Sequence, residues 1–320
     1  MRTIWSLMVL ISCETAINYT PLLQNQIMGT KIERIAEWVL RTNAHLPLPV
    51  LHVIGNFIGS LLAIIPSKRV LTCHTNIEAC FPELSDIEQR RLLRKNFRQT
   101  ACNLMEVGKF WLQPAEKNLA LIRSVSGEEY VRHCLKNGKG VILATPHLGS
   151  WELFGSYCSS EYPLTSMFRK PPLKGLNKLI KDGREGSGGR YVPTDSSGIR
   201  ALLKALRKGE LIGILPDQVP SQGGVIAPFF GKPALTMNLL SSLAIKTNAT
   251  VIFGFAERLP WSRGFRLHFL PPDELITTTS VEESAARINA QVEKCIRMAP
   301  DQYLWVYKRF QKNGEKFYDK

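Results

Sequence analysis

From Gly140 onward, the chain alternates short apolar runs with longer segments in which apolar residues recur at helical spacing. This alternation is typical of a sheet whose strands are linked and covered by helices. We therefore predict an α/β fold with a mixed sheet flanked by helices. The predicted strands are 141–145, 164–168, 211–215, 251–256 and 265–270, and the predicted helices lie near 148–158, 173–183, 197–208, 235–248 and 281–298.

A long helix is predicted before the sheet. Ser85-Asp86-Ile87-Glu88 has the pattern of a capping box, and apolar residues keep helical spacing from there to about Phe110. One face of this helix carries a basic run, which is either a solvated surface or a contact for phosphates or lipid headgroups. The basic run consists of Arg90, Arg91, Arg94, Lys95 and Arg98.

The segment 49–66 is the clearest membrane feature, because its interior holds no charged residue and it runs into Lys68 and Arg69. A helix of this length spans roughly 25 Å, which is short for a bilayer crossing. We predict a short span or an in-plane anchor whose basic flank suits anionic headgroups. A buried core helix is the alternative.

The first residues resemble a weak signal peptide, with Arg2 before an apolar stretch and Ser12-Cys13 after it. A misassigned start is the stronger interpretation, because Met28 opens a second, amphipathic segment. We therefore divide the chain into a misassigned or signal-like segment (1–27), a helical membrane-anchoring region (28–70) and the main domain (71–320).

The charge of the chain limits its possible partners, and its cysteines and histidines indicate whether disulfides or metals are expected. The chain has 41 Lys and Arg against 27 Asp and Glu, a net charge of +14, which favours nucleic acid, an anionic membrane, or a phosphorylated or acidic partner. The seven cysteines form no C-x-x-C pair, as expected of reduced thiols in a cytosolic domain. No histidines take metal-ligand spacing, so we predict neither a metal nor a cofactor.

Three predicted strands are followed by polar residues, namely His147, Arg169 and Asp217. Ligands of open α/β sheets bind at the carboxyl ends of the strands, so these residues are expected to share one site. For Asp217, which precedes a Gly-rich loop, a loop-ordering role is the alternative.

The segment from His147 to Glu152 carries the predicted chemistry. If the Glu152 carboxylate reaches back to the imidazole, it fixes the ring tautomer and leaves the other nitrogen free as a base. Such a dyad suits transfer of an acyl group to a hydroxyl. Gly149 permits close approach of a substrate, and a helix opening at residue 148 would offer N–H groups to an oxyanion. A hydrogen-bonded structural histidine is the alternative.

An enzyme nucleophile is not expected. The chain has no G-x-S-x-G elbow, and no cysteine lies in a recognisable nucleophile signature. Direct transfer from a thioester to the acceptor is therefore simpler than a route through an acyl-enzyme.

At these residues the chain resembles the late acyltransferases of bacterial lipid A biosynthesis, over roughly residues 30–312. The block His147–Glu152 is similar to that family's H-x4-[DE] motif, and further pieces follow in the family's order. These pieces are Asn76 with Phe81-Pro82, Phe168-Arg169, Leu215-Pro216-Asp217-Gln218, the run Pro228-Phe229-Phe230-Gly231-Lys232-Pro233-Ala234-Leu235-Thr236, and Gln302-Tyr303-Leu304-Trp305 with Lys308-Arg309-Phe310.

The resemblance implies a glycerolipid-acyltransferase-like fold and a role for each site residue. His147 would be the general base, Glu152 its orienting partner, and Arg169 a ligand for phosphate or developing negative charge. Asp217, Gly149 and Trp151 would belong to the substrate site.

The resemblance also implies partners and a location. The donor would be acyl carrier protein, with acyl-coenzyme A as the lesser choice. The acceptor would be a hydroxyl of a lipid A precursor in lipopolysaccharide biosynthesis, at the cytoplasmic face of the cell inner membrane, with no nucleic acid involved. Pro146 and Asn238 depart from the family pattern, which predicts altered substrate fit.

Two alternatives stay open. Related enzymes with the same motif act on glycerophospholipids or phosphoinositide mannosides. A different class of function, a non-catalytic basic protein bound to the membrane surface, is also consistent with the charge.

Overall fold

The computed structural model describes residues 26–168, 174–310 and 317–318. The segment 1–27 lies almost wholly outside these ranges, and so does Arg169. In the described part, a seven-stranded sheet has the order β1-β9-β8-β2-β5-β3-β4. Its strands are β1 (Ile122–Ser126), β2 (Val141–Ala144), β3 (Leu164–Phe168), β4 (Arg190–Pro193), β5 (Leu211–Ile214), β8 (Thr250–Arg258) and β9 (Phe265–Phe269).

The sheet is mixed, as predicted. Strands β8 and β9 pair antiparallel, whereas every other pair of neighbours is parallel. All five predicted strands are present, but the sequence analysis missed the two edge strands, β1 and β4. Both are short and mostly exposed, and their sequences, IRSVS and RYVP, lack the apolar run by which the central strands were found. A separate hairpin, β6 (Val225–Phe229) and β7 (Lys232–Thr236), was also missed.

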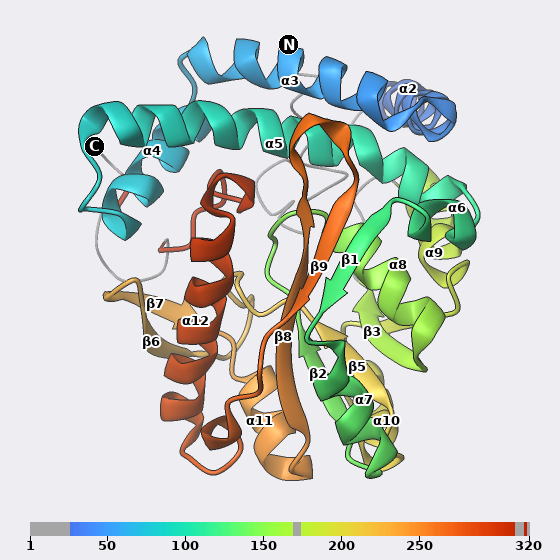
Figure 1. The fold of residues 1–320 in the computed structure, drawn as a ribbon, viewed down its shortest axis with the longest axis vertical. Helices are drawn as coiled ribbons and strands as arrows, with labels where there is room; N and C mark the ends of the chain where they lie inside the picture. The colour runs from blue at the N-terminus through green and yellow to red at the C-terminus, as the bar shows by residue number, and fades with distance from the viewer. Residues whose placement is uncertain (1–25, 169–173, 311–316, 319–320) are drawn as a thin grey trace.

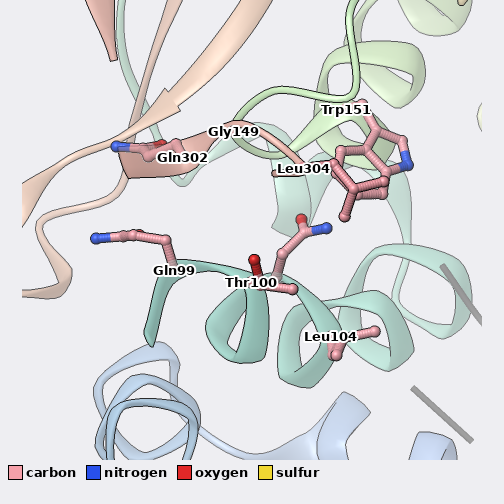
Figure 2. A pocket seen from close by; sticks show the side chains of 8 residues that line it. Gln99, Thr100, Leu104, Gly149, Trp151, Gln302 and Leu304 are labelled. Atoms are coloured by element: carbon pink, nitrogen blue, oxygen red, sulfur yellow. The ribbon is translucent and has the colours of Figure 1, made fainter. Parts of the chain in front are cut away.

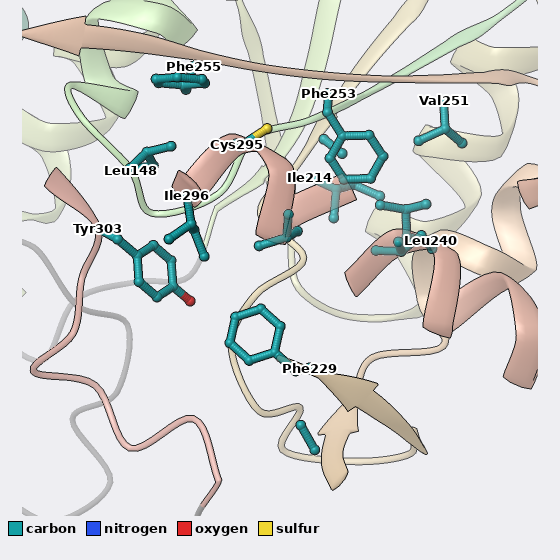
Figure 3. Close-up of a cluster of buried hydrophobic side chains, with 14 of the residues drawn as sticks. Leu148, Ile214, Phe229, Leu240, Val251, Phe253, Phe255, Cys295, Ile296 and Tyr303 are labelled. Carbon is teal, nitrogen blue, oxygen red and sulfur yellow. The ribbon is translucent and has the colours of Figure 1, made fainter. Parts of the chain in front are cut away.

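Helices cover both faces of the sheet (Figure 1). One face packs against α7 (Glu128–Lys136) and α8 (Trp151–Glu161), and the other against α10 (Ser196–Arg207), α11 (Leu239–Thr247) and α12 (Val281–Met298). Strand β8 contributes to both cores because its side chains alternate in direction. Val251, Phe253 and Phe255 belong to the core that contains α12 (Figure 3), whereas Ile252 and Ala256 belong to the other.

A layer of N-terminal helices lies across one end of the sheet (Figure 1). It contains α2 (Gln26–His45), α3 (Leu48–Ile64), α4 (Lys68–Cys80), α5 (Asp86–Leu112) and the short α6 (Ala115–Leu119). The predicted capping box at the start of α5 is confirmed, since both the backbone N–H and the hydroxyl of Ser85 donate to Glu88. Helix α5 buries its apolar residues against the sheet core and carries α3 on its outer side.

Helix α3 lies very close to α5 because of two glycines. A Cβ added at Gly55 would lie 2.8 Å from the Cα of Cys102, and one at Gly59 would lie 2.5 Å from the Cα of Arg98. A larger side chain at either position would push the helices apart. The face of α3 that points toward α5 is therefore fixed by its sequence.

The membrane anchor predicted from the sequence stays a prediction. Among the residues that the structure describes, no single helix is long and apolar enough to cross a bilayer. Helices α3 and α4 meet the length and composition requirement only as a pair, with a bend of 88° between them.

Candidate active site

His147 lies on a non-helical segment that follows β2 and precedes α8. The segment is held from two sides, because the N–H of Leu304 donates to the His147 carbonyl (3.0 Å) and the N–H of Ser150 donates to the Ala256 carbonyl (2.8 Å). Gly149 has a φ of 62°, and a Cβ there would lie 2.0 Å from the Ala256 carbonyl oxygen. Only glycine fits this position, so the path of the chain beside His147 depends on it.

The side-chain partner of His147 is Asp217. Its carboxylate lies 2.8 Å from Nδ1 of the imidazole and accepts the backbone N–H of His147 at 2.9 Å. The contact follows from the sheet order, because β2 and β5 are parallel neighbours and each of these residues follows one of them. His147 and Asp217 thus share a site, as the strand ends predicted.

The pairing also defines the ring tautomer. An ionised carboxylate can only accept, so Nδ1 carries the hydrogen and Nε2 is left with a lone pair. The side-chain nitrogen of Gln218 lies 3.2 Å from Nε2 and can donate to it. A substrate hydroxyl that approaches His147 as a proton donor would therefore replace Gln218.

Asp217 is fully buried and nevertheless keeps its charge. Burial alone would raise the pKa of its carboxyl, but the positive charge that His147 carries when it is protonated and the hydrogen bonds that His147 donates outweigh burial and hold the pKa below its usual value. Tyr303 lies beside the same carboxylate. Burial, together with the negative charge of Asp217, raises the pKa of the Tyr303 phenol well above its usual value, so the phenol stays neutral.

Glu152 does not take the position predicted for it. Its carboxylate accepts hydrogen bonds from Trp111 Nε1 (2.7 Å) and from Arg184, at 3.0 Å from Nε and 2.6 Å from the terminal nitrogen. Burial would raise the pKa of Glu152, but the charge of Arg184 and these hydrogen bonds lower it. In the structure, Asp217 rather than Glu152 bonds to the imidazole.

The physical reason for this difference is the start of α8. The prediction placed a helix from residue 148, which would have brought Glu152 back over His147 one turn later. Instead, the chain stays non-helical, with bridges of Leu148 to Tyr303 and of Gly149 to Ala256, and α8 begins only at Trp151. The Glu152 side chain consequently points toward α5 and α9 (Asn177–Glu185).

The N–H groups available to an oxyanion also differ from those predicted. The N–H groups of Leu148 and Gly149 are occupied, the first by the Pro146 carbonyl and the second by the Gln302 carbonyl. The first three N–H groups of α8, at residues 151–153, have no acceptor among the described residues. Trp151 also packs its indole edge-on against the imidazole, with ring centroids 5.3 Å apart.

A small hollow lies beside this segment, between it and α5 (Figure 2). It is shallow and partly open to solvent. Its walls are Gln99, Thr100, Asn103 and Leu104 of α5 on one side and Gly149, Trp151, Gln302 and Leu304 on the other. Because Trp151 touches both the hollow and His147, the hollow is next to the candidate base.

A buried ionic cluster behind the hollow was not predicted. Arg258, at the end of β8, donates to both carboxylate oxygens of Glu106, which also bonds to His52 Nε2 at 2.6 Å. The side-chain amide of Gln302 brackets the Arg258 backbone, accepting its N–H (2.8 Å) and donating to its carbonyl (2.9 Å). No local sequence pattern links these residues, because they come from α3, α5, β8 and the C-terminal segment.

Asn76, one piece of the resemblance, contacts the C-terminal segment that also holds His147. Asn76 on α4 donates to the carbonyls of Trp305 and Tyr307 at 2.7 and 2.8 Å. Asn96 on α5 donates to the Asp301 carbonyl at 3.0 Å. These amides hold the C-terminal segment against α4 and α5, and the N–H of Leu304 joins the same segment to the His147 carbonyl.

Cysteine chemistry is not favoured in the described part of the chain. Its six cysteines are buried. Burial raises the pKa of Cys102 and Cys295 to about 12, and that of Cys73 and Cys80 further. Because the thiolate is the nucleophilic form, these side chains are poorly suited to accept an acyl group.

Comparison with known proteins identifies the family of this chain. Residues 26–312 match the model of the bacterial lipid A biosynthesis acyltransferase family. A lipid A biosynthesis lauroyltransferase of Escherichia coli (strain K12) is 31% identical over 279 residues, covering 87% of this chain and 90% of that protein. A palmitoleoyltransferase and a myristoyltransferase of the same pathway and organism are 29% and 23% identical, each over 83% of this chain and over 86% and 82% of their own lengths.

The protein is therefore an α/β acyltransferase. Because the family model covers most of its length, the chain belongs to the bacterial lipid A biosynthesis acyltransferases.

Proposed function

We propose that this protein transfers a fatty acyl chain from a thioester donor to a hydroxyl of a lipid A precursor, with His147 as the general base and Asp217 as its partner. The observation that carries the proposal is the buried hydrogen bond between the Asp217 carboxylate and Nδ1 of His147. It leaves Nε2 as the only basic position of the ring, in a tautomer that suits proton removal.

The reaction would then proceed in balanced steps. Nε2 takes the proton of the acceptor hydroxyl as the oxygen attacks the thioester carbonyl, and Asp217 stabilises the imidazolium. The free N–H groups at the start of α8 are suitable donors for the oxyanion. A C–O bond forms, the C–S bond breaks, and the imidazolium returns the proton to the leaving thiolate. No acyl-enzyme is needed.

Acyl carrier protein is the proposed donor, and a phosphorylated glucosamine lipid is the proposed acceptor. The names of the similar Escherichia coli proteins support lipid A biosynthesis as the setting. The net charge of +14 suits both an acidic carrier protein and a phosphorylated lipid. Arg169, which lies outside the described residues, remains a proposed ligand for a phosphate or for developing charge.

The proposed place of action is the cytoplasmic face of the inner membrane, and α3 supports it. Because its glycine face is fixed against α5, an apolar strip is left on the outer side of the helix. The strip consists of Val50, Val53, Phe57, Leu61 and Ile64. Val53, Phe57 and Ile64 are 69%, 66% and 71% exposed with respect to the described residues, which is unusual for large apolar side chains that share one face of a helix.

The surroundings of the strip fit a lipid surface. Trp261, at the tip of the β8–β9 hairpin, is 91% exposed, and its neighbour Ser262 contacts His52 on α3. Tryptophans of this kind favour the headgroup region of a bilayer. Arg98, which is exposed in the basic run of α5, contacts Ser60 of α3 and can meet anionic headgroups. An in-plane anchor is therefore the form of membrane contact that we propose.

Mass spectrometry of lipid A tests the function. Cells that lack the protein are compared with cells that re-express either the wild type or the His147→Ala variant. We expect lipid A to gain one acyl chain with the wild type and none with the variant. An acyl count that does not depend on the protein would overturn the acceptor assignment, and transfer to purified glycerophospholipids or phosphoinositide mannosides would then identify the alternative acceptor.

A further inference from the structure

The hollow between α5 and the His147 segment contains polar groups that the protein itself does not satisfy. Asn103 is only 5% exposed, yet its Nδ2 has no hydrogen-bond acceptor within the described residues. The side-chain nitrogen of Gln99 and the hydroxyl of Thr100 likewise have no partner there, and Figure 2 shows the Thr100 hydroxyl directed from α5 toward the segment of Gly149. These side chains line the hollow, and none of the three atoms is fully enclosed, so each can bond to a ligand that enters it.

The hollow carries no net charge. Arg258 lies behind it and bonds to Gln99, but its charge is balanced by Glu106, which is completely buried. Burial would lower the pKa of Arg258, and Glu106 counters this and raises it, so the two stay ionised as a pair. A phosphate would find no uncompensated cation in this hollow. A neutral group with an acceptor oxygen suits it better.

The polar atoms fit one kind of neutral group in particular. Asn103 Nδ2 can donate to a carbonyl oxygen, and the Thr100 hydroxyl can accept an N–H. Leu104, Leu304 and Trp151 supply apolar walls around them. This is the complement of a secondary amide flanked by methylene groups.

We propose that this hollow binds a secondary amide of the substrate, with Asn103 as the residue that donates to the amide carbonyl. The inference rests on the proposed function, because that function supplies two amides of this kind. In a carrier-bound or coenzyme A thioester, two methylene groups separate the sulfur from the pantetheine amide. In an amide-linked 3-hydroxyacyl chain, the hydroxyl is on the second carbon from the amide carbonyl. Either amide would lie next to His147 when its substrate reacts.

Equilibrium binding by calorimetry tests the proposal without requiring turnover. The donor probe is the dodecyl thioether of N-acetylcysteamine, and its matched control is dodecyl pentyl thioether, which has no amide. The acceptor probe is N-(3-hydroxydecanoyl)glucosamine. Each is titrated into the wild-type full chain and into the Asn103→Leu variant, which preserves side-chain size. Asn103→Asp, which keeps the shape but loses the donor, serves as a second variant in case Leu disturbs the fold.

We expect both variants to bind one amide-bearing probe roughly 3- to 10-fold more weakly than the wild type does, the loss typical of one hydrogen bond. The probe whose binding weakens shows whether the bound amide is that of the donor or that of the acceptor. Dodecyl pentyl thioether should bind all proteins equally, and Asn137→Leu, on the exposed end of α7, should behave as wild type. Equal binding of both amide probes to the wild type and to folded Asn103 variants would overturn the proposal.

These outcomes separate this proposal from the proposed function. If the wild type binds the amide probes through Asn103 but adds no acyl chain to lipid A, the hollow is an amide site and the acceptor assignment is incorrect. If lipid A gains its acyl chain while Asn103 makes no difference to binding, only the amide proposal fails.

Discussion

The Asp217 carboxylate accepts two hydrogen bonds from His147, one from the ring Nδ1 and one from the backbone N–H. The same side chain therefore fixes both the tautomer of the imidazole and the position of the segment that carries it. Since β2 and β5 are parallel neighbours, their carboxyl ends bring these residues together although they are far apart in the sequence.

Asp217→Asn should lower kcat for acyl transfer by about 10²- to 10⁴-fold. The amide keeps the size of the carboxylate but loses its charge, and its NH₂ group favours the tautomer with the hydrogen on Nε2. Steady-state transfer from an acyl-thioester donor measures the effect, with circular dichroism as a check of the fold. A variant that is folded and retains more than a tenth of the wild-type kcat would argue against the role of Asp217.

Glu152→Gln should lower the free energy of unfolding at neutral pH by about 3 kcal/mol, because it removes the Glu152 charge from the ion pair with the partly buried Arg184. The pKa of Glu152 is lower in the folded protein than its unfolded value of about 4.3. Its contribution is therefore complete above about pH 4.3 and is lost as the pH falls through the folded pKa. Urea unfolding at several pH values should show the wild type and variant converging in acid. A difference that grows in acid would contradict this.

Gly149→Ala should lower stability and turnover together, since its Cβ would meet the Ala256 carbonyl at 2.0 Å and the residue has a positive φ. We expect a loss of about 1–3 kcal/mol or more in stability. Gly155→Ala, in the interior of α8, is the matched control because a Cβ there meets nothing within 4 Å. That change should raise stability by up to about 1 kcal/mol. Thermal unfolding of both variants measures the contrast, and equal effects would contradict it.

Phe57→Ser should weaken binding to vesicles of phosphatidylethanolamine and phosphatidylglycerol by about 10-fold, because it removes an exposed apolar side chain from the strip on α3. Ile226→Ser is the control, since Ile226 is 54% exposed on β6, away from α3 (Figure 1). Vesicle sedimentation measures the binding. The in-plane anchor would be incorrect if both variants bound like the wild type, or if both lost binding to the same extent.

Much of the fold could be predicted from the sequence, because apolar periodicity reports burial. Helix α12 and strand β3 have the predicted bounds, and β2 and β5 differ from theirs by one residue. The edge strands β1 and β4 could not be found this way, since an edge strand with exposed side chains has no apolar run. Patterns of burial therefore recover the centre of the sheet better than its edges.

The candidate site was predicted in part. The rule that ligands bind at the carboxyl ends of strands correctly brought His147 and Asp217 to one place. Spacing alone assigned Glu152 to the imidazole, because the sequence does not reveal that residues 148–150 stay non-helical through bridges to Tyr303 and Ala256. The cluster of Arg258, Glu106 and Gln302 depends on contacts between distant elements, for which a single sequence carries no local signal.

The most direct test of the account is the turnover of His147→Ala in purified form, with an acyl-thioester donor and a lipid A precursor in vesicles. We expect kcat to fall by about 10²-fold or more, since the general base is lost, while vesicle binding and the unfolding transition stay as in the wild type. A folded, vesicle-bound His147→Ala variant that turns over at the wild-type rate would contradict the central claim.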